Sequence, residues 1–105
     1  MTDKRIVLTT TGSEEEARNI ASTLVERRLA ACVNILGAME SVYRWQGEVQ
    51  TEPEYLLVIK TTAAAFDRVC DAIKELHSYE VPECVMFSVE DGSEAYLNWI
   101  GESID

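Results

Sequence analysis

The chain has 105 residues, 47% of them hydrophobic, and a formal net charge of −10 at pH 7. This length fits one domain, residues 1–105, and the apolar content excludes a disordered chain. An acidic surface repels a phosphate backbone, and no apolar run approaches the roughly 20 residues that span a bilayer, so we expect neither nucleic acid nor a membrane as a partner. The N-terminal residues lack the apolar core of a signal peptide, which predicts a cytoplasmic protein.

The first elements are a short strand and a helix. A continuous apolar run at 6–8, followed by threonines, predicts a strand over 5–11. Ser13 precedes Glu16 by three residues, which is the pattern of a capping box, and apolar residues then recur at helical spacing. These signals predict a helix over 14–28.

Two long strands follow in the middle of the chain. β-branched and aromatic residues are frequent in 31–45 and 48–61, and the Gln-Gly pair at 46–47 is a tight-turn signal. Gly37 marks a bend or a bulge, and Pro53 makes the start of the second strand an edge or an irregular extension. The two segments together predict a long β-hairpin.

The last third predicts a helix, a strand and a short terminal helix. Thr62 is a candidate cap for a helix over 63–76, an apolar strand covers 84–89, and Ser93 caps the terminal helix. The complete order predicts an α+β fold, a ferredoxin-like βαββαβ sandwich with a long hairpin and a short C-terminal helix. Right-handed crossovers place both main helices on one face of the sheet.

The second face of the sheet predicts self-association. The strand segments 6–8, 56–59 and 85–87 are apolar without alternation, so apolar side chains occupy both faces. A contiguous exposed patch of this kind is rare on a monomer. The terminal helix is too short to cover four strands, so we expect another copy of the chain to cover them.

The three cysteines, Cys32, Cys70 and Cys84, are odd in number and widely spaced, with no CxxC. This pattern argues against a disulfide framework and a zinc ribbon, and in a cytosolic chain it predicts reduced thiols packed as small hydrophobes. Cys32 is alternatively a soft metal ligand, if it is exposed where subunits meet.

Two other segments are candidates for chemistry. His77, Tyr79, Glu80 and Glu83 lie within seven residues, a set that suits divalent-metal binding or acid–base chemistry, or else a packed histidine beside solvated carboxylates. The aromatic turn at 43–48 suits a recognition surface, a subunit contact or simple cross-strand packing. The signatures of common enzymes are absent from the sequence, and we expect no enzymatic activity.

Five segments together resemble the CutA family of divalent-cation tolerance proteins. They are LAACVN at 29–34, SVYRWQGE at 41–48, LVIKT at 57–61, HSYEVPE at 77–83 and YLNWI at 96–100. Family members typically carry a proline after the histidine, where this chain has Ser78. The resemblance covers nearly the whole chain.

The resemblance implies a homotrimer that takes part in tolerance of divalent cations, copper especially, with copper binding in some members. For this chain we expect copper or another divalent cation as ligand and no cofactor needed for folding. We assign its candidate metal ligands to Cys32, His77, Glu80 and Glu83. The family's architecture also resembles that of the trimeric PII signalling proteins. That likeness gives the alternative function, a sensor that binds a small molecule in clefts between subunits, and we assign that cleft to Trp45, Lys60 and Tyr79.

Overall fold

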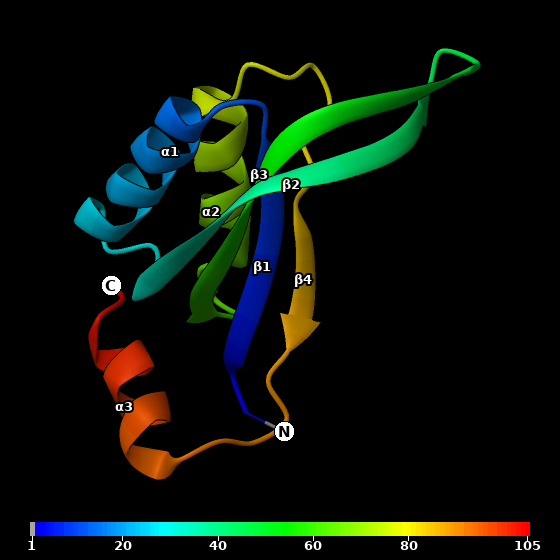
Figure 1. Cartoon of the computed structure of the whole chain (residues 1–105). Coiled ribbons are helices and arrows are strands. Elements are labelled where there is room, and N and C mark those ends of the chain that lie inside the picture. The colour runs from blue at the N-terminus through cyan, green and yellow to red at the C-terminus, as the bar shows by residue number, and fades with distance from the viewer. Residues whose placement is uncertain (1) are drawn as a thin grey trace.

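A four-stranded antiparallel sheet in the order β2-β3-β1-β4 organises the computed structural model, which describes residues 2–105 (Figure 1). The α+β class and the βαββαβ order are confirmed, and a third helix ends the chain. The strands are β1 (Lys4–Thr11), β2 (Cys32–Trp45), β3 (Glu48–Thr62) and β4 (Val85–Ser88). The helices are α1 (Glu14–Glu26), α2 (Phe66–Leu76) and α3 (Glu94–Glu102). Within residues 2–105, no helix is long and apolar enough to cross a membrane.

The two main helices begin in different ways. Helix α1 starts at the predicted capping box, where the Ser13 hydroxyl accepts from the Glu16 N–H at 3.1 Å. Helix α2 starts at Phe66, three residues later than expected. The Thr62 hydroxyl accepts from the Ala65 N–H at 3.3 Å, so Thr62 closes a turn ahead of the helix instead of capping it.

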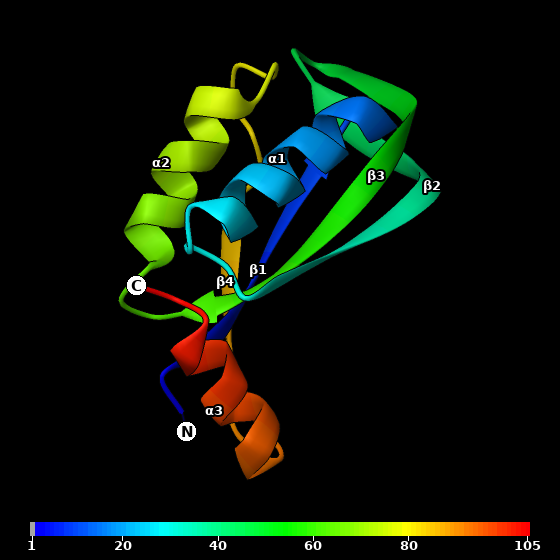
Figure 2. The same ribbon diagram turned by 90° about the vertical axis from the view of Figure 1, so that its left-hand side faces the viewer.

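Helices α1 and α2 cover one face of the sheet (Figure 2). On that face Val7 lies opposite Ile59, and both are fully buried against apolar residues of the helices. Alternate residues of the same strands point to the other face, which neither of these helices covers.

The uncovered face is a row of apolar side chains across three strands. Leu8 lies opposite Val58 on β3 and Val85 on β4, and Ile6 lies opposite Phe87. Directly paired residues share one face of a sheet, so these five side chains form one surface. Leu8, Ile6 and Val58 are half-buried, while Val85 and Phe87 are 45% and 51% exposed. We call this surface the open face.

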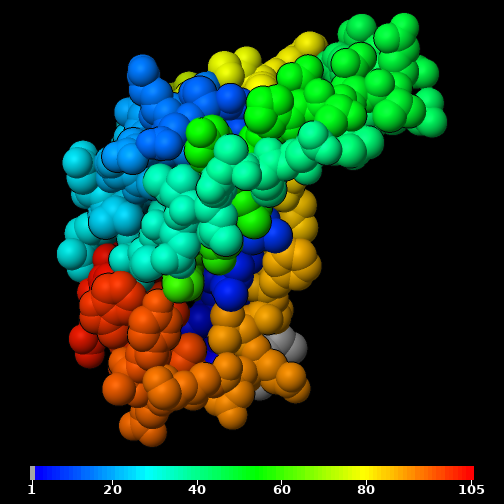
Figure 3. Space-filling view, in the orientation of Figure 1, coloured from blue at the N-terminus to red at the C-terminus, as the bar shows by residue number. Residues whose placement is uncertain are grey.

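The hairpin of β2 and β3 extends past the rest of the sheet. Strand β1 ends opposite Tyr55, and beyond this point β2 and β3 pair only with each other, including Pro53. This outer part, residues 39–54, projects from the body as an arm (Figure 3) and makes the molecule 44 Å long against 25 and 22 Å. Gln46 and Gly47 form the tight turn with φ of 49° and 83°, values that suit a two-residue hairpin turn.

A break in the pairing at Gly37 marks the base of the arm. The register shifts between Leu36 and Met39, an irregularity where the sequence predicted a bend or a bulge. A Cβ atom at Gly37 would overlap the ring of Tyr55, so only glycine lets the two strands approach here.

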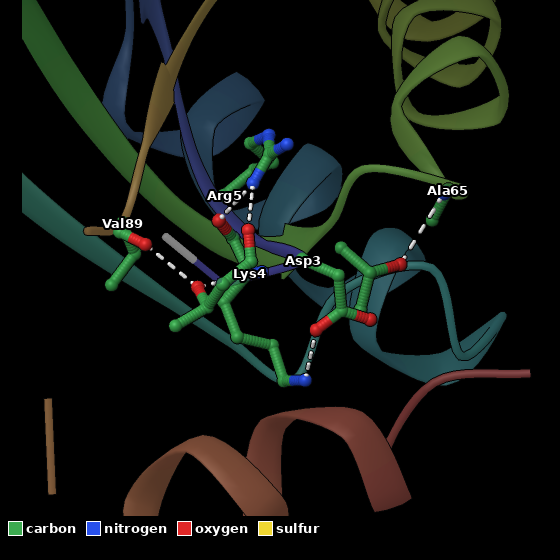
Figure 4. A network of polar contacts seen from close by, with 7 residues as sticks. Asp3, Lys4, Arg5, Ala65 and Val89 are labelled. Atoms are coloured by element: carbon green, nitrogen blue, oxygen red, sulfur yellow. Dashed lines mark hydrogen bonds and ion pairs between the residues drawn. The ribbon is translucent and has the colours of Figure 1, made fainter. Parts of the chain in front are cut away.

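The N-terminal residues form a network of polar contacts (Figure 4). This network lies at the end of the sheet opposite the arm (Figure 1). The Thr2 hydroxyl donates to the Val89 carbonyl at 2.7 Å, and the Val89 N–H donates to the Lys4 carbonyl at 3.1 Å. Lys4 also pairs with Asp3, and this hydrogen bond lowers the pKa of the Asp3 carboxyl. The start of β1 is thereby tied to the end of β4.

The cysteines differ from the sequence expectation. Cys70 on α2 and Cys84, just before β4, form a disulfide with a Cα–Cα distance of 6.2 Å, and only Cys32 is free. The prediction of three reduced thiols is therefore wrong for two of them. Sequence spacing could not show that the turn after α2 folds back on the helix. The bond encloses residues 71–83, and therefore the whole HSYEVPE segment.

We expect this disulfide to stabilise the subunit. Replacing both partners in Cys70→Ser/Cys84→Ser should lower the free energy of unfolding by about 3 kcal/mol, because the closed loop restricts the unfolded chain. Urea unfolding at a fixed protein concentration measures the difference. Without reductant, denatured wild type should show one reactive thiol per chain, and Cys32→Ser should show none. Three thiols in the unreduced wild type would contradict the bond.

Candidate functional site

The loop after α2 is anchored by a buried histidine. The His77 side chain is fully buried. Its Nε2 donates to the Thr10 carbonyl oxygen at 2.7 Å, and its Nδ1 accepts from the Tyr79 N–H at 3.0 Å. An imidazole with its proton on Nε2 satisfies both contacts, so both ring nitrogens are occupied. The ring thus fixes the loop against the end of β1.

Glu16 approaches the same ring from α1. Its Oε1 lies 3.2 Å from His77 Nδ1, and this buried oxygen has no hydrogen-bond partner among residues 2–105. The capping-box glutamate predicted from the sequence therefore faces the histidine. Helix α1, strand β1 and the loop after α2 meet at this point.

Tyr79 joins the same loop to the hairpin. Its ring lies 4.6 Å from the His77 ring between centroids, and its hydroxyl donates to Glu54 Oε2 at 2.7 Å. Partial burial raises the pKa of the Tyr79 phenol, and the hydrogen bond to the Glu54 carboxylate raises it further. Gly12 leaves room for this ring, since a Cβ atom there would lie 3.0 Å from the hydroxyl oxygen.

A cavity of about 660 Å³ lies between the arm and residues 79–83. One wall comes from alternate residues of β2, which share a face of the strand. Apolar atoms form most of the lining surface. The lining residues are Thr10, Met39, Ser41, Val42, Tyr43, Trp45, Glu54, Leu56, Tyr79, Glu80, Val81 and Glu83.

The cavity is negatively charged. Three of its lining residues, Glu54, Glu80 and Glu83, are carboxylates, and none is a lysine, arginine or histidine. Glu54 is buried, with 7% of its surface exposed, while Glu80 and Glu83 are exposed at the rim. The arrangement suits a ligand that brings positive charge.

The four predicted metal ligands do not meet in one chain. Glu80 and Glu83 line the cavity, whereas His77 lies behind the loop with both nitrogens occupied. Cys32 pairs with Lys60 at the other end of the hairpin, six strand residues from Glu54, or about 20 Å. Among residues 2–105, no group of three histidines, cysteines or carboxylates is close enough to hold a metal ion.

The predicted cleft residues are partly brought together. Trp45 and Tyr79 line the cavity. Lys60 lies outside it, with its Nζ 5.7 Å from the Tyr96 ring centroid. Sequence reasoning missed Glu54 and Met39 as cavity residues. The signal was present in the alternation of Met39, Ser41, Tyr43 and Trp45, which places these side chains on one face of the arm.

Comparisons with known proteins agree over nearly the whole chain. The sequence profile of a family described as CutA1 divalent ion tolerance protein matches residues 5–103. A divalent-cation tolerance protein CutA of Thermus thermophilus is 50% identical over 100 residues, which covers 95% of this chain and 97% of that protein. The chloroplastic CutA 1 of Oryza sativa is 39% identical over 93% of this chain, which spans only 55% of that protein.

Solved structures give the same result. The divalent cation tolerance protein Cut A1 from Thermus thermophilus superposes with a TM-score of 0.95 at 49% identity, covering 97% of this chain and 99% of that one. The periplasmic divalent cation tolerance protein CutA from Archaeoglobus fulgidus gives a TM-score of 0.94 at 35% identity, covering 97% and 99%.

Tyr79 predicts a specific stability loss at high pH. The folded protein holds the phenol proton more tightly than the unfolded chain, whose tyrosines ionise near pH 10, so the free energy of unfolding should fall as pH rises above about 10. In Tyr79→Phe this fall should be shallower, as measured by urea unfolding from pH 8 to 11. Tyr96→Phe, on α3, is the control. An identical pH dependence in wild type and Tyr79→Phe would contradict the assignment.

Proposed function

Because the chain belongs to the CutA1 family of divalent ion tolerance proteins, we propose that it acts in cation tolerance as an assembly of three identical copies. The open face is the observation that carries the self-association. The names of the relatives describe tolerance of cations and specify no reaction, so the proposal includes no catalytic step.

The open face is an apolar surface that a second copy of the chain would bury. Ile6, Leu8, Val58, Val85 and Phe87 form a continuous apolar surface on the sheet face that α1 and α2 leave uncovered. Large exposed apolar patches mark interaction sites. Strand β2 is an edge strand, and its outer part lies in the projecting arm, so it has free backbone groups for contact with another copy.

The same assembly supplies what a single chain lacks for metal binding. Cys32 pairs with Lys60 and shares the open face with Ile6 and Phe87, because all four lie in one row across the sheet. A copy placed on the open face therefore adds its own side chains near the Cys32 thiol. We propose Cys32 as a soft ligand for copper and Glu80 and Glu83 as hard ligands for divalent cations. His77, whose ring nitrogens are both occupied, would have to give up at least one of these hydrogen bonds to bind a metal.

A second candidate function is small-molecule binding in the cavity. Its volume of about 660 Å³ lies within the range of ligand pockets, and its largely apolar lining with a few polar groups is typical of them. Trp45 and Tyr79, the cleft residues named from the sequence, supply two of its aromatic walls.

The cellular location stays a prediction. The sequence predicts a cytoplasmic protein, but the Cys70–Cys84 disulfide weighs against this, because disulfides persist mainly in oxidising compartments. The free Cys32 is compatible with either location.

The assembly is tested by its mass in solution. Light scattering should give three times the 11.8 kDa chain mass for wild type and a lower mass for Phe87→Glu, because the new charge would be buried in the interface. Val25→Glu, an apolar-to-acidic change at an exposed site on α1, is the matched control and should keep the wild-type mass. A wild-type mass of one chain, or no change in Phe87→Glu, would refute the role of the open face.

Copper binding is tested in a Cys70→Ser/Cys84→Ser background, where Cys32 is the single thiol. We expect Cys32→Ser to weaken Cu(I) affinity at least tenfold in competition with a chromogenic chelator, and His77→Ala to change it less. Glu80→Gln/Glu83→Gln should weaken divalent-cation binding in calorimetric titrations, with Glu26→Gln on α1 as the control. Equal Cu(I) affinity with and without Cys32 would sink the thiol assignment.

A further inference from the structure

We propose that the cavity between the arm and residues 79–83 binds an organic cation, an ammonium group carried on an apolar body. The inference rests on the second candidate function above, that this cavity binds a small molecule, and adds the chemical class of the ligand. Three independent features of the cavity support it: a buried carboxylate, the absence of basic side chains and an aromatic lining.

The buried carboxylate is Glu54. It is 7% exposed and accepts a hydrogen bond from the Tyr79 hydroxyl at 2.7 Å. Among residues 2–105, no lysine, arginine or histidine nitrogen forms an ion pair with it. A buried carboxylate without a counter-charge is costly in free energy, and a positive ligand group beside it offsets that cost.

The rest of the lining excludes an anionic ligand. Glu80 and Glu83 add two carboxylates at the rim, and the lining residues include no basic side chain. The chain as a whole carries a net charge of −10, so the surrounding field also attracts cations. A nucleotide or a free phosphate would meet repulsion from three carboxylates and no basic group to bind it.

The aromatic lining favours an organic cation over a metal ion. Tyr43, Trp45 and Tyr79 all line the cavity. Aromatic faces attract alkylammonium and guanidinium groups, and several aromatic rings around one space are the usual site for quaternary ammonium groups. A small hard cation needs several oxygen ligands at about 2.0–2.6 Å. The described residues hold no such group, and a cavity of about 660 Å³ is far larger than one ion.

Choline and its uncharged carbon analogue, 3,3-dimethyl-1-butanol, test the charge directly because they share one shape. We expect choline to shift the NMR signal of the Trp45 indole saturably, and the alcohol to bind at least tenfold more weakly. An anionic analogue, 3,3-dimethylbutanoate, should not bind. The protein is used as the intact assembly with the disulfide formed.

Substitutions of cavity residues test whether choline binds in the cavity. Glu54→Gln should weaken choline binding at least tenfold, and Trp45→Leu at least fivefold. Glu26→Gln removes one carboxylate from the surface of α1 and should leave binding unchanged, which separates the cavity from general attraction to an acidic protein. If Glu54→Gln does not fold, Trp45→Leu and Glu80→Gln, both at exposed residues, carry the test.

The binding results distinguish failure of the organic-cation class from failure of the cavity as a small-molecule site. Equal binding of choline and the alcohol, or binding of the anion, would overturn the cation class while leaving the cavity as a small-molecule site. Binding of none of the three would overturn both this inference and the cavity as a small-molecule site, whereas the assembly and copper experiments stand apart from it. No choline binding, together with a lower assembly mass in Glu54→Gln, would likewise overturn the inference and assign Glu54 to the contact between copies.

Discussion

Strand β3 pairs with two neighbours along its inner half and with one along its outer half. From Leu56 to Lys60 it lies between β1 and β2, and this part holds Leu57 and Ile59 in the core beneath the helices. Before Tyr55 it pairs with β2 alone and forms the arm. The point where β1 ends therefore divides the molecule into a packed body and a projecting hairpin.

The cavity exists because of this division. β1 stops just before the capping box of α1, and its Thr10 carbonyl accepts the hydrogen bond from His77. The loop fixed by that bond faces the base of the arm, and the Tyr79 hydroxyl joins the two by donating to Glu54, the last residue of the arm before the doubly paired region. The disulfide ties Cys84, at the end of the same loop, to Cys70 in α2. Backbone pairing, one buried histidine and one covalent bond thus position the cavity wall.

The sequence predicted the fold well because its signals are local. The capping box at Ser13, the turn at 46–47 and the bend at Gly37 each depend on neighbouring residues, and each lies where it was expected. The failures involve contacts between distant residues. Cys70 and Cys84 pair through a loop whose path no local pattern shows, and Glu54 reaches Tyr79 across 25 residues of sequence. Whether side chains converge depends on strand register, which composition does not reveal.

The exposed residues of the arm contribute little to the stability of the single subunit and are available for contact with other molecules. Val42 and Val49 are 65% and 64% exposed and lie outside the buried core of the subunit. Changes there cost the isolated subunit little free energy of unfolding, because surface substitutions rarely do. The substitutions that this segment tolerates will therefore depend on which property of the protein is selected. A screen for thermal stability of the single chain would accept replacements along the arm that a screen for contact with other molecules would reject.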